Sequence, residues 1–125
     1  MDYVDPQMTT AEILEQIPRS TMSVEERDGE VGVFYSPGYG AGFWNLPEEI
    51  SYLRQHQDLV LAAEVSAEHF AEVAMNLGLG HQMWCGGGEV TVRVQYMPHG
   101  TLYRITEYDG FERIETSYED WQIVI

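Results

Sequence analysis

The sequence contains no lysine and few positive charges of any kind. Its 6 basic residues are all arginines, whereas aspartate and glutamate together number 21, so the formal net charge is -15 at pH 7. A surface field of this sign repels phosphate backbones and anionic lipid headgroups, and it argues against direct binding to nucleic acid or to a membrane. It favours a basic protein as partner, while acid that serves only solubility is the open alternative.

Cysteine and long apolar runs are scarce as well. Cys85 is the only cysteine, which excludes an internal disulfide and fits a reducing compartment. No run approaches the roughly 18 consecutive apolar residues that a membrane-spanning helix needs. Residues 1–6 are acidic and lack the apolar segment of an export signal. We therefore expect a cytoplasmic protein.

Spacings that indicate metal or catalytic sites are missing too. The four histidines and Cys85 form no CxxC, HExxH or HxH pattern, and no DxDxDG loop is present to bind calcium. Cys85 follows His81 by four residues, but in a glycine-rich stretch this spacing is weak evidence for a nucleophile and its base, and a small buried hydrophobe is the commoner role. We expect a protein that is not an enzyme and that uses no cofactor and no metal.

The apolar residues that are present suffice for one folded domain. Hydrophobic residues make up 44% of the 125 residues and aromatic residues 12%. A chain of this length can bury enough apolar surface to offset its conformational entropy without disulfides or metals. No linker, repeat or low-complexity block divides it, so we expect residues 1–125 to form a single acidic α+β domain.

Helix signals occur in the first two-thirds of the chain. Residues 9–17 begin with a threonine cap and carry acids in the first turn, which favours a short helix. Residues 46–57 predict a second helix, and residues 59–64 a further helical turn. The clearest helix spans residues 66–77, with a serine cap at its start and a glycine after its end. Its predicted core stripe is Phe70, Val73, Ala74 and Leu77.

Strand signals flank these helices. An Asp28-Gly29 pair separates residues 22–27 from residues 31–35, which is typical of a hairpin. Residues 89–97 alternate apolar with polar side chains, and residues 102–108 and 111–116 follow as two further strands. The predicted fold is therefore an antiparallel sheet, formed by an N-terminal hairpin plus a C-terminal meander, packed against two or three helices. Residues 121–125 are expected to add a last strand or to enter the core.

Two segments combine aromatic side chains with features of binding surfaces. Residues 36–45 hold three glycines and three aromatics, which suits a protein interface or, as an alternative, a nucleotide held between aromatic faces with help from Arg54, Arg93 or Arg104. No lysine follows these glycines and the GxGxxG spacing is not met. In the second segment, residues 107–112 and residues 118–121 alternate acids with aromatics. Such a mixture can anchor a basic partner, although aromatic residues in the core and acids in water explain it equally well.

Three segments resemble a group of small bacteriophage and prophage proteins. They are SPGYGAGFWN at residues 36–45, WCGG at residues 84–87 and GTLYRITEYDGFERI at residues 100–114. The group is similar in carrying a PGYGAGxxxWN-like loop, a CGG step before a strand and a GTxFxIxEYDGxExI-like ending. The resemblance runs in patches over residues 34–114. It implies a phage-type origin and supplies no catalytic residues.

Charge and resemblance together lead to one functional expectation. The chain is expected to be a non-enzymatic phage-type inhibitor that binds a basic surface of a host nucleic-acid-binding defence complex in the host cytoplasm, as an acidic DNA mimic of anti-CRISPR type would. The alternatives are a sponge for a nucleotide signal and an immunity protein against a cationic nuclease toxin; the oligomeric state stays open. The expected partner-binding residues are Glu107, Asp109, Glu112, Glu115, Glu119, Asp120, Tyr39, Phe43, Trp44 and Trp121.

Overall fold

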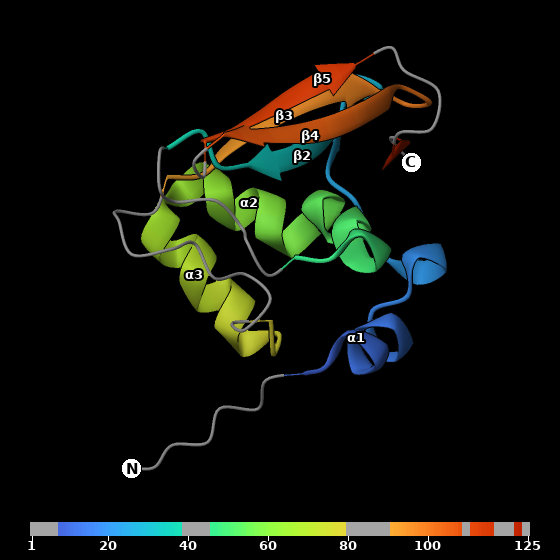
Figure 1. Ribbon diagram of the computed structural model, residues 1–125, viewed down its shortest axis with the longest axis vertical. Coiled ribbons are helices and arrows are strands. Elements are labelled where there is room, and N and C mark those ends of the chain that lie inside the picture. Colours follow the sequence, from blue (N-terminus) through green and yellow to red (C-terminus); the bar gives the residue numbers. More distant parts are fainter. Residues whose placement is uncertain (1–7, 39–45, 80–90, 109–110, 117–121, 124–125) are drawn as a thin grey trace.

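The helices form one layer of the molecule (Figure 1). The computed structural model describes residues 8–38, 46–79, 91–108, 111–116 and 122–123. Within the described part, no helix is both long and apolar enough to cross a bilayer. In chain order the helical elements are α1 (Thr10–Gln16), η1 (Arg19–Thr21), η2 (Glu48–Gln55), α2 (Gln57–Val65) and α3 (Ala67–Asn76).

Two small antiparallel sheets form the other layers, and they confirm the expected α+β fold class. One sheet has the strand order β1-β2-β3 and the other β5-β4-β6. The first sheet lies between the helices and the second sheet, and Figure 1 shows β2 directly above α2. The strands are β1 (Glu26–Arg27), β2 (Glu30–Tyr35), β3 (Arg93–Pro98), β4 (Leu102–Tyr108), β5 (Phe111–Thr116) and β6 (Gln122–Ile123).

Strand β2 is buried on both faces, which places it at the centre of the molecule. Successive strand residues point to opposite faces. Val31 and Val33 pack with Tyr103 of β4 against the second sheet, whereas Phe34 points to the helices and meets the ring of Phe70 edge-on, with the centroids 4.9 Å apart. The core therefore consists of two clusters, one on each side of this strand.

The predicted hairpin before β2 is confirmed. Arg27 pairs with Glu30, which leaves Asp28 and Gly29 as a two-residue loop. Both loop residues have positive φ, 52° and 81°. Aspartate and glycine are among the residues that tolerate this backbone best, and a turn of that type matches the twist of the flanking strands.

Two helices begin where their capping residues predict. Thr9 Oγ1 accepts a hydrogen bond from the Glu12 N–H at 3.2 Å, and Glu12 Oε1 accepts one from the Thr9 N–H at 2.8 Å, which completes a capping box before α1. Ser66 Oγ accepts from the His69 N–H at 3.0 Å and caps α3. In the predicted core stripe of α3, Phe70 and Ala74 are buried, whereas Val73 and Leu77 are only half-buried.

The helix predicted over residues 46–57 is instead a 3-10 segment, η2, followed by a separate helix. Ile50 has non-helical angles (φ -118°, ψ 19°) that interrupt the segment. His56 then forms a bridge with Val24 and caps α2, because its Nδ1 accepts a hydrogen bond from the Asp58 N–H at 3.2 Å. The chain therefore bends at His56, and α2 extends to both sides of the turn predicted over residues 59–64.

The predicted C-terminal meander is wrong in one pairing. Strand β3 pairs with β2, from Tyr35 opposite Arg93 to Glu30 opposite Pro98, while β4 pairs with β5 and β6. The turn after β3 carries the chain from one sheet into the other, with Gly100 at φ 84°. The physical reason lies in β3, because Val94 contacts the helical core whereas Met97, on the other face, packs against the second sheet. Strand β6 confirms an additional strand in the last residues.

Gly32 is required where α2 approaches β2, and this predicts the effect of a single methyl group. A Cβ at this position would lie 2.9 Å from Val60 Cγ1 and 3.1 Å from Tyr96 Cε2. We expect Gly32→Ala to lower the free energy of unfolding by about 1–3 kcal/mol because it overpacks the contact. Urea denaturation measures the loss. The double variant Gly32→Ala/Val60→Ala should lose less stability than the sum of the two single variants, because the smaller side chain at position 60 makes room for the new methyl group. Losses that simply add would contradict this explanation.

Candidate functional site

Seven of the ten expected partner-binding residues lie outside the described residues, as do Cys85 and His81, so their roles stay predictions. The seven are Tyr39, Phe43, Trp44, Asp109, Glu119, Asp120 and Trp121. The structure does place Glu107, Glu112 and Glu115, on β4 and β5.

Glu112 is not part of an acidic surface, and this corrects the expectation for it. Its side chain is 4% exposed and forms a bidentate pair with Arg54, with Nη1 to Oε1 at 2.9 Å and Nη2 to Oε2 at 3.0 Å. The Ser36 N–H also donates to Glu112 Oε1 at 2.9 Å, and Arg54 donates to the Phe34 carbonyl at 3.2 Å. This carboxylate therefore holds the second sheet to β2 and to η2.

Of the other two placed acids, Glu115 lies beside two arginines. Arg113 Nη2 is 3.0 Å from Glu115 Oε2, and Arg104 Nη2 is 3.9 Å from Glu115 Oε1. Glu107 is exposed at the end of β4. The described residues of β4 and β5 thus carry three acids and two arginines, which leaves little net charge. The Asp109-Gly110 pair in the sequence is the signal from which this pairing could have been found, because β4 pairs with β5 in a register that puts Arg104 opposite Glu115.

Among the described residues, the larger excess of acid lies on the helical layer, and a smaller one lies in the hairpin, where residues 25–30 carry four acids and Arg27. In residues 8–21 and 46–79 there are eight acids and two arginines, Arg19 and Arg54. Arg54 is occupied by Glu112, and Glu64 is paired with Arg27. Seven exposed acids remain, and we call them the helical acids. They are Glu12, Glu15, Glu48, Glu49, Asp58, Glu68 and Glu72.

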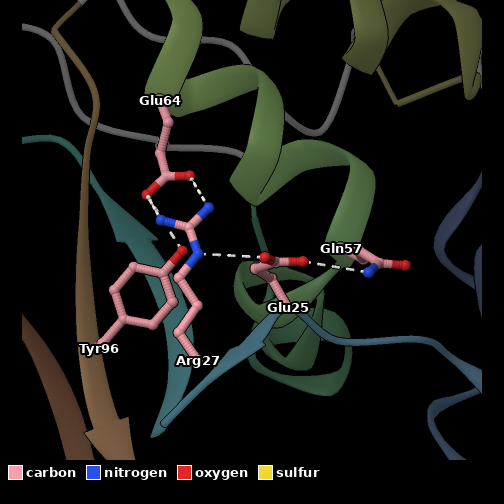
Figure 2. Close-up of polar contacts among 5 residues, drawn as sticks. All are labelled: Glu25, Arg27, Gln57, Glu64 and Tyr96. Atoms are coloured by element: carbon pink, nitrogen blue, oxygen red, sulfur yellow. Dashed lines mark hydrogen bonds and ion pairs between the residues drawn. The ribbon is translucent and has the colours of Figure 1, made fainter.

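The side of α2 next to the sheet is held by a polar network (Figure 2). Arg27 donates to both oxygens of Glu64, at 2.6 and 3.1 Å, and its Nε donates to Glu25 at 3.1 Å. Gln57 donates to Glu25, and this hydrogen bond, ahead of the one from Arg27, lowers the pKa of Glu25. The pKa of Tyr96 is raised to about 12, mainly by burial and next by the hydrogen bond that its hydroxyl donates to Glu64. The network ties the hairpin to α2 and neutralises much of the acid there.

An open groove of about 400 Å³ lies between α2 and α3. Leu61 and Val65, on the outer face of α2, are 38% and 71% exposed. The groove is lined by Asp58, Leu61, Ala62, Val65, His69, Val73, Asn76 and Leu77. Among the described residues, no group of three or more histidine, cysteine, aspartate or glutamate side chains is arranged to hold a metal ion.

Comparison with known proteins gives no relative for this chain. No family model, no curated protein and no solved structure matches it. The resemblance to bacteriophage proteins therefore stays a prediction that rests on the sequence segments themselves. Of these segments, the structure describes residues 36–38, 100–108 and 111–114.

The burial of the Arg54–Glu112 pair predicts that loss of Arg54 costs more stability than loss of an arginine in a half-exposed pair. We expect Arg54→Met to lower the free energy of unfolding by about 3–5 kcal/mol, because it leaves the Glu112 carboxylate buried without its cation. The matched control is Arg27→Met, in the half-exposed network of Figure 2, which should cost much less. Denaturant unfolding compares them. Equal losses for both variants would contradict the structural role given to Arg54.

His56 predicts a pH-dependent stability. Burial, only partly opposed by the Asp58 carboxylate, lowers its pKa below the usual 6.5, and the cap on α2 requires an unprotonated Nδ1. A histidine with a lowered folded pKa contributes stability that is complete above the unfolded pKa and is lost as the pH falls through the folded pKa.

A cap substitution isolates this histidine from the many carboxylates. His56→Asn keeps an acceptor but cannot titrate, so between pH 7 and pH 5 it should lose less stability than the wild type, by up to about 1 kcal/mol. Thermal or urea unfolding at each pH measures this difference. His69→Gln, at an exposed histidine, is the control and should follow the wild type. Parallel curves for His56→Asn and the wild type would show that the cap does not titrate.

Proposed function

We propose that this protein is a non-enzymatic inhibitor of phage type whose helical acids bind a basic surface of a host nucleic-acid-binding protein. The sharpest form of the proposal is an anti-CRISPR protein that occupies a groove for DNA or guide RNA. One observation carries it. The helical layer exposes seven acids against Arg19, while the described C-terminal strands are nearly neutral.

The charge asymmetry supplies both steering and competition. Acids gathered on one layer present the same sign as a phosphate backbone to the lysines and arginines of a nucleic-acid site. A partner held in this way releases its bound counterions when the complex forms. The complex should therefore weaken steeply as the salt concentration rises. Solubility alone gives no reason for the described acids to be concentrated on the helical layer.

The acids are also held on ordered elements. Glu12 is part of the capping box of α1, and Glu68 lies in the first turn of α3 behind the Ser66 cap. Glu48 and Glu49 open η2, which carries the buried Leu53 and Arg54. A charge on a packed helix loses little conformational freedom on binding, which favours affinity over the same charge on a loose tail.

Two charge-matched variants test the proposal. Glu48→Gln/Glu68→Gln/Glu72→Gln removes three helical acids, and Glu26→Gln/Asp28→Asn/Glu30→Gln removes three acids from the hairpin. With tagged protein and a bacterial lysate, the wild type should recover a nucleic-acid-binding complex that elutes as salt rises. The first variant should recover about tenfold less or lower, and the second should stay close to the wild type.

The recovered complex then gives a direct readout. Added wild-type protein should displace DNA or RNA from it in a gel-shift titration, and the first variant should not. Two results would overturn the proposal: no salt-sensitive partner in the lysate, or equal losses for the two variants, which would mean that total charge matters and its position does not.

A further inference from the structure

Helix α2 has two apolar faces, and only one of them is used by the fold. Leu59, Val60 and Ala63 point into the core and are at most 8% exposed. Leu61 and Val65 lie on the other side and line the groove with Ala62. A surface helix normally needs one apolar stripe, and a second exposed stripe marks a contact surface.

Helix α3 completes the groove from the opposite side. Its core positions are Phe70 and Ala74, while Val73 and Leu77 are half-buried and face the groove together with His69. With nine and ten residues, α2 and α3 are each roughly 14–15 Å long at 1.5 Å per residue. Two helices of that length can contact a partner helix over two to three turns, through side chains of the partner at i, i+3, i+4 and i+7.

Charge selects the kind of helix. Asp58 lines the groove on α2, and Glu72 lies beside it on α3, one turn from both His69 and Asn76. Neither α2 nor α3 contains an arginine, and Arg27, which contacts α2, is paired with Glu64 on the side of α2 next to the sheet. An occupant must therefore be apolar on one side and cationic on its flanks. A second copy of this chain is disfavoured because each copy carries a net charge of -15.

From the apolar groove and its acidic rim, we propose that α2 and α3 bind a cationic amphipathic helix of a partner protein. The inference rests on the proposed function, since it names the part of a basic partner that docks. The apolar stripe of that helix lies on Leu61, Val65 and Val73. Its lysines or arginines lie over Asp58 and Glu72, and the rest of the helical acids steer its approach.

A defined probe tests the groove apart from the rest of the surface. The probe is a fluorescent 14-residue peptide with leucines at i, i+3, i+4 and i+7 and arginines at most other positions. A second peptide has the same composition with the leucines scrambled around the helix. Fluorescence anisotropy should show binding of the first peptide and at least about tenfold weaker binding of the second.

Matched variants locate the binding. Leu61→Gln/Val65→Gln removes the apolar contact without changing charge and should weaken binding by about tenfold or more. Leu14→Gln/Met75→Gln alters two other exposed apolar residues, which lie outside the groove, and should stay within about twofold. Asp58→Asn/Glu72→Gln should weaken binding and reduce its salt dependence, whereas Glu26→Gln/Asp28→Asn should do neither. Thermal unfolding of each variant confirms that it is folded.

Each contrary outcome would contradict the binding of a cationic helix in the groove, and the outcomes can be told apart. Equal binding of the two peptides would mean that charge acts without the groove, which would leave the proposed function standing. No binding of either peptide, with a salt-sensitive partner still recovered from lysate, would have the same meaning. Dimers that form in sedimentation and disappear in Leu61→Gln/Val65→Gln would instead identify a second copy as the occupant.

Discussion

The buried pair of Arg54 and Glu112 is the contact on which the arrangement of the three layers depends. It joins η2 of the helical layer to β5 of the second sheet, and it does so beside β2, whose Phe34 carbonyl and following Ser36 N–H share its hydrogen bonds. Two charges removed from water are tolerated because the guanidinium and the carboxylate meet in a bidentate geometry. One acid of this strongly acidic chain is therefore structural, and the layers are held in register around it.

This arrangement also decides which surfaces remain for a partner. The first sheet is covered by helices on one face and by the second sheet on the other, so β2 offers nothing to solvent except its ends. On the outward side of the second sheet, Arg104 and Arg113 lie close to Glu115, so the described residues there are nearly neutral. Among the described residues, the outer side of the helices combines negative charge with exposed apolar side chains, because the helical acids and the groove between α2 and α3 lie there together.

Features fixed by neighbouring residues could be predicted from the sequence. The Thr9 capping box, the Asp28-Gly29 turn and the Ser66 cap all depend on residues within four positions, so their signals survive in the finished fold. The pairing of β3 with β2 could not be predicted, because an alternating strand fits either neighbour equally well and tertiary packing chooses. Likewise, the net charge predicted an acidic protein but not which of its acids are exposed. Glu112 is buried against Arg54, which is 58 positions away, and nothing local in the sequence marks the two as partners.

The absence of lysine and the position of the acid are connected. Four of the six arginines lie within 4 Å of a described carboxylate: Arg27, Arg54, Arg104 and Arg113. Arg27 and Arg54 use the planar fork of the guanidinium to bind both oxygens of one carboxylate, a geometry that an ammonium group does not offer. Because these cations are committed to the hairpin, the interior and the second sheet, they do not neutralise the helical acids. The surface asymmetry therefore follows from where the few arginines lie, more than from how many acids the chain contains.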